Sequence, residues 1–197
     1  MAANKLKEKE IVNVLIVDDH KMLRDGLKVM LASLKKWIHF KVMEAESGEE
    51  ALLKITRNPF QLIILDYNMP GISGSETVYR ILRFKPKMKI LALSNYDELP
   101  YIQHMIDAGA KGYVLKNIEP SEMLHAIKTI FSDKRYYCNE VAIKLLEAEE
   151  EKTIEKIRSK KILTRRATWL SETKEIKNPY LGKKMPTCGE VKEEMKQ

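Results

Sequence analysis

Short apolar runs alternate with amphipathic segments from residue 12 to about residue 132. The apolar runs predict five strands, and the segments between and after them repeat apolar residues at helical spacing, which predicts five helices. This alternation is typical of a doubly wound α/β fold built on a parallel sheet. The strands are expected near residues 12–17, 40–45, 61–65, 89–93 and 112–115.

Local signals indicate where the helices begin and end. The first helix is expected at 21–34, and the Ser-Gly-Glu-Glu sequence at 47–50 reads as a capping box that opens the second. A third helix should follow Gly74, and a fourth should occupy 99–107. Pro120 suits the first position of a fifth helix.

Three carboxylates are expected at one edge of this sheet. Right-handed crossovers place the carboxyl ends of all the strands together, where Asp18 and Asp19 follow the first strand and Asp66 ends the third. Carboxylates this close repel each other, and a hard divalent cation held by oxygen ligands relieves the repulsion. The pattern therefore predicts a Mg²⁺ site.

Ser94 and Lys116 follow the fourth and fifth strands at the same edge. A metal-bound acidic pair beside a lone carboxylate nucleophile, a hydroxyl group and a lysine is suited to moving a phosphoryl group. Taken singly, each residue has an ordinary explanation as a turn residue, a cap or a solvated charge. Their joint placement after successive strands favours the functional interpretation.

The last third of the chain has a different pattern. A sixth helix is expected from Asn139 to about Lys156, and its acidic cluster at 147–151 indicates an exposed connecting helix. The basic run at 156–166 fits a phosphate-contacting patch or a solvated linker equally well. Beyond it, residues 163–197 are expected to have weak or partial order, because four helix breakers interrupt them: Pro179, Gly182, Pro186 and Gly189.

Composition narrows the cellular context. The net charge of +7 is modest for 197 residues, and no apolar stretch is long enough to span a bilayer. The charged first ten residues lack the apolar segment of a signal peptide, so a cytoplasmic location without membrane attachment is expected. Cys138 and Cys188 match no metal-binding spacing and are expected to be free thiols.

The motifs resemble the receiver domain of two-component response regulators. The resemblance rests on residues 17–20, 65–74, 92–94 and 109–116, and it covers residues 12–132. It implies a flavodoxin-like sheet with strand order 2-1-3-4-5 and a Mg²⁺ cofactor. It also implies a sensor histidine kinase as phosphoryl donor and a homodimer that forms on phosphorylation.

The resemblance assigns the metal ligands. Asp66 would be the phosphoacceptor and, together with Asp19 and the backbone carbonyl of Asn68, would bind Mg²⁺ directly. Asp18 would act mainly through metal-bound water.

The same resemblance assigns the phosphoryl contacts and the switch. Ser94 would hydrogen-bond a phosphoryl oxygen, and Lys116 would pair with the phosphoryl group. Ser94 and Tyr113 would form the conformational switch, in which the tyrosine ring fills space that the serine vacates. The alternative for Tyr113 is an ordinary amphipathic aromatic residue at the rim.

Within the family, residues 116–120 and 134–139 are similar to the NarL/FixJ branch, whose members end in a LuxR-type helix-turn-helix that reads DNA. Residues 163–166 resemble the opening of that module, but no candidate recognition helix follows. The expected organisation is an N-terminal extension (1–11), a receiver (12–132), a linker helix (133–162) and a truncated or divergent helix-turn-helix remnant (163–197).

The expected function is that of a response regulator that accepts a phosphoryl group on Asp66 and controls transcription. The alternative is a receiver that acts only through protein contacts because its DNA-binding module is incomplete. DNA binding is accordingly expected to be weak and without sequence preference. A phosphohydrolase is disfavoured, because Asn68 stands where a general acid would be needed. Slow loss of the chain's own phosphoryl group is the most catalysis expected.

Overall fold

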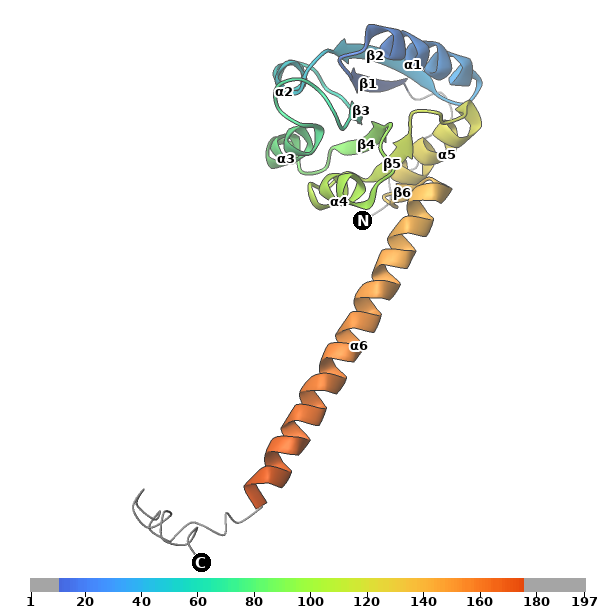
Figure 1. Cartoon of the computed structure of the whole chain (residues 1–197). Helices are drawn as coiled ribbons and strands as arrows, with labels where there is room; N and C mark the ends of the chain where they lie inside the picture. Colours follow the sequence, from blue (N-terminus) through green and yellow to red (C-terminus); the bar gives the residue numbers. More distant parts are fainter. Residues whose placement is uncertain (1–10, 176–197) are drawn as a thin grey trace, which may run out of the picture. The chain divides into compact units, whose positions relative to one another are not determined.

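The computed structural model describes residues 11–175, and residues 166–175 by their backbone alone. A single parallel sheet of six strands lies at its centre, in the order β2-β1-β3-β4-β5-β6 (Figure 1). The expected parallel sheet and the order of its first five strands are confirmed. The strands are β1 (Ile11–Val17), β2 (His39–Ala45), β3 (Leu62–Asp66), β4 (Lys89–Ser94), β5 (Gly112–Leu115) and β6 (Tyr136–Tyr137).

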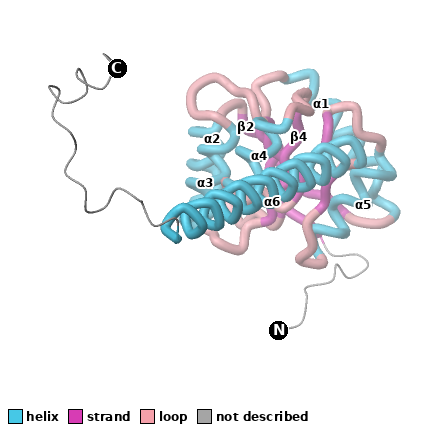
Figure 2. Tube along the Cα trace, turned by 60° about the horizontal axis from the view of Figure 1, so that its bottom comes forward, coloured by secondary structure: helices cyan, strands magenta, loops and turns pink. Residues whose placement is uncertain are grey.

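Helices cover both faces of the sheet. Helices α1 and α5 lie on one face, and α2, α3 and α4 lie on the other (Figure 1). Figure 2 shows the strands between these two groups. The helices are α1 (Lys21–Ser33), α2 (Gly48–Arg57), α3 (Gly74–Phe84), α4 (Leu99–Asp107), α5 (Pro120–Phe131) and α6 (Asn139–Glu175), and a short 3-10 helix, η1 (Leu34–Lys36), follows α1.

The helix starts agree with the sequence signals. Ser47 caps α2 by accepting a hydrogen bond from the backbone N–H of Glu50. The Glu50 carboxylate reaches back to the N–H of Glu46, one residue before the position that a capping box predicts. Pro120 is the first residue of α5, as expected.

The core is centred on β1, β3 and β4, whose apolar side chains are almost completely buried except for Ile11 at the start of β1. Strands buried on both faces have near-continuous apolar sequences, which is why their positions could be predicted. All five residues of β3 are buried, including Asp66 at its carboxyl end. The core thus carries a carboxylate, of which only 4% is exposed, to the edge of the sheet.

Strand β6 was not expected, because residues 133–162 were assigned to the linker. The N–H of Tyr136 donates to the carbonyl of Lys111 at 3.1 Å, and the N–H of Cys138 donates to the carbonyl of Tyr113 at 3.2 Å. These bonds satisfy the outer edge of β5. A two-residue strand is too short to show periodicity, so the sequence pattern missed it. Strand β1 also begins at Ile11, one residue earlier than expected.

Helix α6 is longer than predicted, since it passes Lys156 and continues to Glu175. Neither proline nor glycine occurs between residues 139 and 175, so nothing in that stretch interrupts the helix. The expected boundary between linker helix and remnant, at 162/163, falls inside α6. The remaining predictions for the tail, and those for residues 1–10, lie outside the described residues.

Backbone contacts place residues up to Glu147 in one compact unit, which contains the sheet, and the rest of α6 in a second. Within the described part of the chain, no helix is both long and apolar enough to cross a membrane.

Candidate functional site

The structure brings the three predicted carboxylates together. Asp18 follows β1 and Asp66 ends β3, and these strands are neighbours in which Val17 pairs with Leu65. The ligand atoms of Asp18, Asp19, His20 and Asp66 all lie within 4.8 Å of one another. Asp18 and Asp66 are only 1% and 4% exposed, so their mutual repulsion is poorly screened by water.

Lys116 supplies the compensating charge. Its ammonium nitrogen donates to Asp18 Oδ2 at 2.7 Å and to Asp66 Oδ2 at 2.8 Å, and its side chain is 10% exposed. Burial opposes the charged form of Lys116, but the two carboxylates outweigh this effect and raise its pKa. Burial raises the pKa of Asp66, and it does so although Lys116 and the backbone of Asn68 act in the opposite direction.

One carboxylate oxygen at the site lacks a hydrogen bond. Asp19 Oδ1 is buried and accepts none from any residue that the structure describes, although His20 Nδ1 lies 2.8 Å away. A buried carboxylate oxygen that accepts no hydrogen bond, beside two further carboxylates, matches the all-oxygen donor set that a hard divalent cation prefers. The residues present therefore fit Mg²⁺. Asn68 adjoins the site through its backbone, and the ligand role of its carbonyl stays a prediction.

Arg24 supports the site, although it is not among the site residues predicted from the sequence. Its buried guanidinium donates to the carbonyl of Asp18 at 2.7 Å, and it also pairs with Glu44 at 3.0 Å and Glu46 at 2.6 Å. Burial opposes its charge, but these carboxylates raise its pKa overall. The arginine thus holds the backbone at the end of β1. The available signal was its place on the apolar face of α1, three residues before Leu27.

Ser94 and Tyr113 both contact the loop that follows β4. The N–H of Tyr96 donates to Ser94 Oγ at 3.1 Å, and the Tyr113 hydroxyl donates to the carbonyl of Tyr96 at 2.6 Å. Tyr113 is completely buried, which raises its pKa to about 12. Its ring is therefore not an exposed rim aromatic in this structure. The N–H of Lys116 donates to the Ser94 carbonyl at 2.9 Å, so the serine and the lysine are joined through the backbone.

An aromatic cluster that the sequence did not reveal adjoins Asp66. The ring of Tyr67 lies edge-on to that of Tyr101, with centroids 5.1 Å apart, and Tyr96 lies 4.8 Å from Tyr101. The Tyr67 hydroxyl is 3.2 Å from His104 Nδ1. These residues come from three separate segments, and only the fold brings them together.

Glycine is required where α3 meets the end of β3. A Cβ atom on Gly74 would lie 2.3 Å from the backbone oxygen of Asp66. The N–H of Gly74 instead donates to the carbonyl of Tyr67 at 2.9 Å. The absence of a side chain at Gly74 allows α3 to begin directly against the site.

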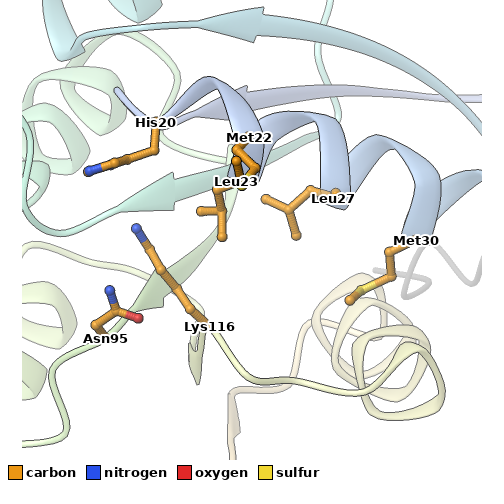
Figure 3. Close-up of a pocket in the computed structure, with 8 residues that line it drawn as sticks. His20, Met22, Leu23, Leu27, Met30, Asn95 and Lys116 are labelled. Atoms are coloured by element: carbon orange, nitrogen blue, oxygen red, sulfur yellow. The ribbon is translucent and has the colours of Figure 1, made fainter.

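A pocket of about 480 Å³ opens beside the carboxylates. Figure 3 shows Lys116 and Asn95 facing His20 and helix α1 across it. The α1 side is lined by apolar side chains: Met22, Leu23, Leu27 and Met30. Because Lys116 lines the pocket and contacts Asp66, the pocket leads toward the buried carboxylate.

Residues 14–128 match the family model of the response regulator receiver domain. The chain belongs to this family. The match spans every site residue predicted from the sequence, from Asp18 to Lys116, and it accounts for their arrangement at the carboxyl ends of the strands.

Curated relatives agree with this assignment. The chain is 37% identical over 136 residues to the response regulator GacA of Pseudomonas protegens, which corresponds to 69% of this chain and 63% of GacA. It is 36% identical over 146 residues to the response regulator UvrY of Escherichia coli, covering 73% of this chain and 66% of UvrY. The chain thus spans less than two thirds of the length of either relative.

A solved structure confirms the fold. A LuxR-family two-component response regulator from an Aurantimonas species superposes with a TM-score of 0.65 at 24% identity. The match covers 71% of this chain and 99% of that structure. At this identity the likeness establishes the receiver fold alone.

Proposed function

We propose that this receiver accepts a phosphoryl group on Asp66 from a sensor histidine kinase and thereby controls transcription. The observation that carries the proposal is the contact of Lys116 with both Asp18 and Asp66, at 2.7 and 2.8 Å. This contact fixes a positive charge beside the one carboxylate that ends the central strand. A cytoplasmic location stays a prediction from the sequence.

The transfer step uses groups that the site already holds. A carboxylate oxygen of Asp66 attacks the phosphorus of a phosphohistidine, the P–N bond breaks, and the histidine leaves while an acyl phosphate forms on Asp66. The ammonium of Lys116 is placed to pair with a phosphoryl oxygen. Mg²⁺, when held by Asp19, Asp66 and the Asn68 carbonyl, with Asp18 acting mainly through metal-bound water, would neutralise charge on the phosphoryl oxygens.

The same site suggests how the modification is transmitted. A phosphoryl group adds negative charge and strong acceptors, which draw Ser94 and Lys116 toward it. Movement of Ser94 shifts the loop that carries Tyr96, whose carbonyl holds the Tyr113 hydroxyl. The face formed by α4 and β5 is then repacked. We propose no catalysis on other substrates, and only slow hydrolysis of the acyl phosphate.

The alternative is a receiver that works through protein contacts alone. It is supported by the continuity of α6 through residues 163–175, because the resemblance places the opening of a DNA-binding module at residues 163–166. A gel shift against a randomised duplex pool at several salt concentrations separates the two. Enrichment of one pseudo-palindromic sequence at physiological salt would support a regulator that binds specific DNA. Binding that shows no sequence preference and weakens steadily as salt is added would support the alternative.

Phosphorylation is tested by intact mass after incubation with acetyl phosphate. The wild type should gain one phosphoryl group when Mg²⁺ is present and none when it is chelated. Asp66→Asn should gain none, and Asp107→Asn, which changes an exposed carboxylate on α4, should behave like the wild type. Modification of Asp66→Asn at the wild-type rate would show that the acceptor is misassigned.

A further inference from the structure

The part of α6 after Glu147 has exposed charges without partners. Residues 149–165 are all exposed, and their acidic and basic groups are segregated. Residues 149–155 contain four glutamates and one lysine, whereas residues 156–165 contain five basic residues and no acidic one. No ion pair joins charged side chains within 149–165, as far as the structure describes the chain. A helix without such pairs lacks a usual source of stability.

A short stripe on this helix combines apolar and charged residues. Glu150, Ile154, Ile157 and Lys161 follow one another at intervals of four, three and four residues, which places them on one face. Ile154 and Ile157 are 49% and 62% exposed. The intervals are the same when the stripe is read in either direction. Its two ends carry opposite charges.

We propose that this stripe pairs in antiparallel orientation with the same stripe of a second copy of the chain. A two-fold axis midway between residues 155 and 156 would set Ile154 against Ile157 of the second copy. Glu150 would face Lys161 of the second copy, and symmetry would repeat both contacts. Each acidic half would therefore lie along a basic half.

Charged residues along one edge of the stripe are also complementary in the antiparallel orientation. Glu151 and Arg158 are seven residues apart and lie along the same edge of the helix. In an antiparallel two-fold pair, equivalent edges meet, so Glu151 would lie near Arg158 of the second copy. A parallel pair would instead set Glu150 against Glu150 and Lys161 against Lys161. Like charges facing each other disfavour that orientation.

Charge complementarity also favours a second copy over other occupants. A nucleic acid would be attracted to the basic half but repelled by the four glutamates of the acidic half. A membrane surface requires a broad apolar face, whereas the apolar part of this stripe consists of only two isoleucines. A second copy offers the acidic, apolar and basic groups in the matching order.

The test measures self-association of the full, unphosphorylated chain by sedimentation equilibrium over a range of concentrations. Glu150→Lys and Lys161→Glu should each weaken association by about tenfold or more, because each creates like-charged pairs. The double variant Glu150→Lys/Lys161→Glu should restore it, since the swapped charges match again in the antiparallel orientation. Glu155→Lys and Lys156→Glu make the same charge changes on the opposite side of the helix and should have little effect.

The outcomes separate the antiparallel pair from its competitors. A double variant as weak as the single ones, or controls as damaging as the stripe variants, would overturn the proposal. A wild type that stays monomeric throughout would do the same. Association that survives Ile154→Ala/Ile157→Ala undiminished would place the contact in the receiver and also contradict the proposal. Circular dichroism should show that wild-type helicity rises with protein concentration, whereas that of this double alanine variant does not.

Discussion

The receiver and the exposed part of α6 use charge in opposite ways. In the receiver, Lys116 contacts carboxylates that lie 98 and 50 residues away in sequence, in a site almost closed to water. In residues 149–165 of α6, acidic and basic groups lie in consecutive segments, and they are exposed and form no ion pairs with one another. The fold thus completes the charge pairs of the receiver site, whereas the charges of residues 149–165 are left for a partner to complete.

This difference determines what each charge contributes. A buried pair is costly to desolvate, and removal of one member leaves the other charge buried and uncompensated. Exposed pairs each contribute little and are screened by salt, so α6 needs several of them to act together. Substitutions should therefore have large, local effects in the receiver and small, cumulative effects in α6.

The largest effect is expected for Lys116→Met, which leaves Asp18 and Asp66 facing each other without a cation. The variant should lose about 3 kcal/mol of unfolding free energy in urea denaturation without divalent ions. Mg²⁺ should stabilise the variant more than the wild type, because the carboxylates would no longer share a protein cation. Lys87→Met, which removes an exposed lysine, is the control. If Mg²⁺ stabilises all three proteins equally, Lys116 and Mg²⁺ do not share the carboxylate site, and the prediction is wrong.

The sequence predicted the carboxylate edge because strand ends in a parallel sheet converge whatever the details of packing. Asp18, Asp19, Asp66, Ser94 and Lys116 could therefore be named in advance. The support from Arg24 depends on contacts with residues 20 and 22 positions away, and no local pattern encodes them.

Two further features escaped prediction for physical reasons. Strand β6 is two residues long and exists because the edge of β5 offers free backbone groups. The length of α6 escaped prediction because the helix breakers of the tail begin only at Pro179, and nothing between Asn139 and Glu175 breaks a helix.

An intermediate effect is expected at alkaline pH from Tyr113. Burial raises its pKa to about 12, against about 10 in the unfolded chain, so the folded state holds this proton more tightly. Its contribution to stability is complete below pH 10 and is lost as pH rises toward 12. The wild type should lose up to about 2 kcal/mol more than Tyr113→Phe over this range. The measurement is urea denaturation of the two proteins at several pH values. If both lose the same unfolding free energy as pH rises, the hydroxyl is hydrated and the prediction is wrong.

The smallest effect is expected for Lys144→Met, which tests a contact between the first turns of α6 and the loop that joins β4 to α4. The Lys144 ammonium donates to the backbone carbonyl of Asp97 at 2.9 Å and to its carboxylate at 2.6 Å, three residues after Ser94. Because both side chains are partly exposed, the thermal midpoint should fall by no more than about 2 °C.

The informative readout of Lys144→Met is the transmission of phosphorylation. Amide chemical shifts of residues 141–146 should respond to a beryllofluoride phosphate mimic in the wild type and in Lys152→Met, but less in Lys144→Met. The ammonium lowers the pKa of Asp97, so the contact is present above the ordinary carboxyl pKa and is lost as pH falls through the lowered value. Wild type and Lys144→Met should therefore converge in midpoint as Asp97 is protonated. If the midpoints of the two proteins still differ in acid, Lys144 acts through packing of its aliphatic chain. The ion pair between Lys144 and Asp97 would then not transmit phosphorylation to α6.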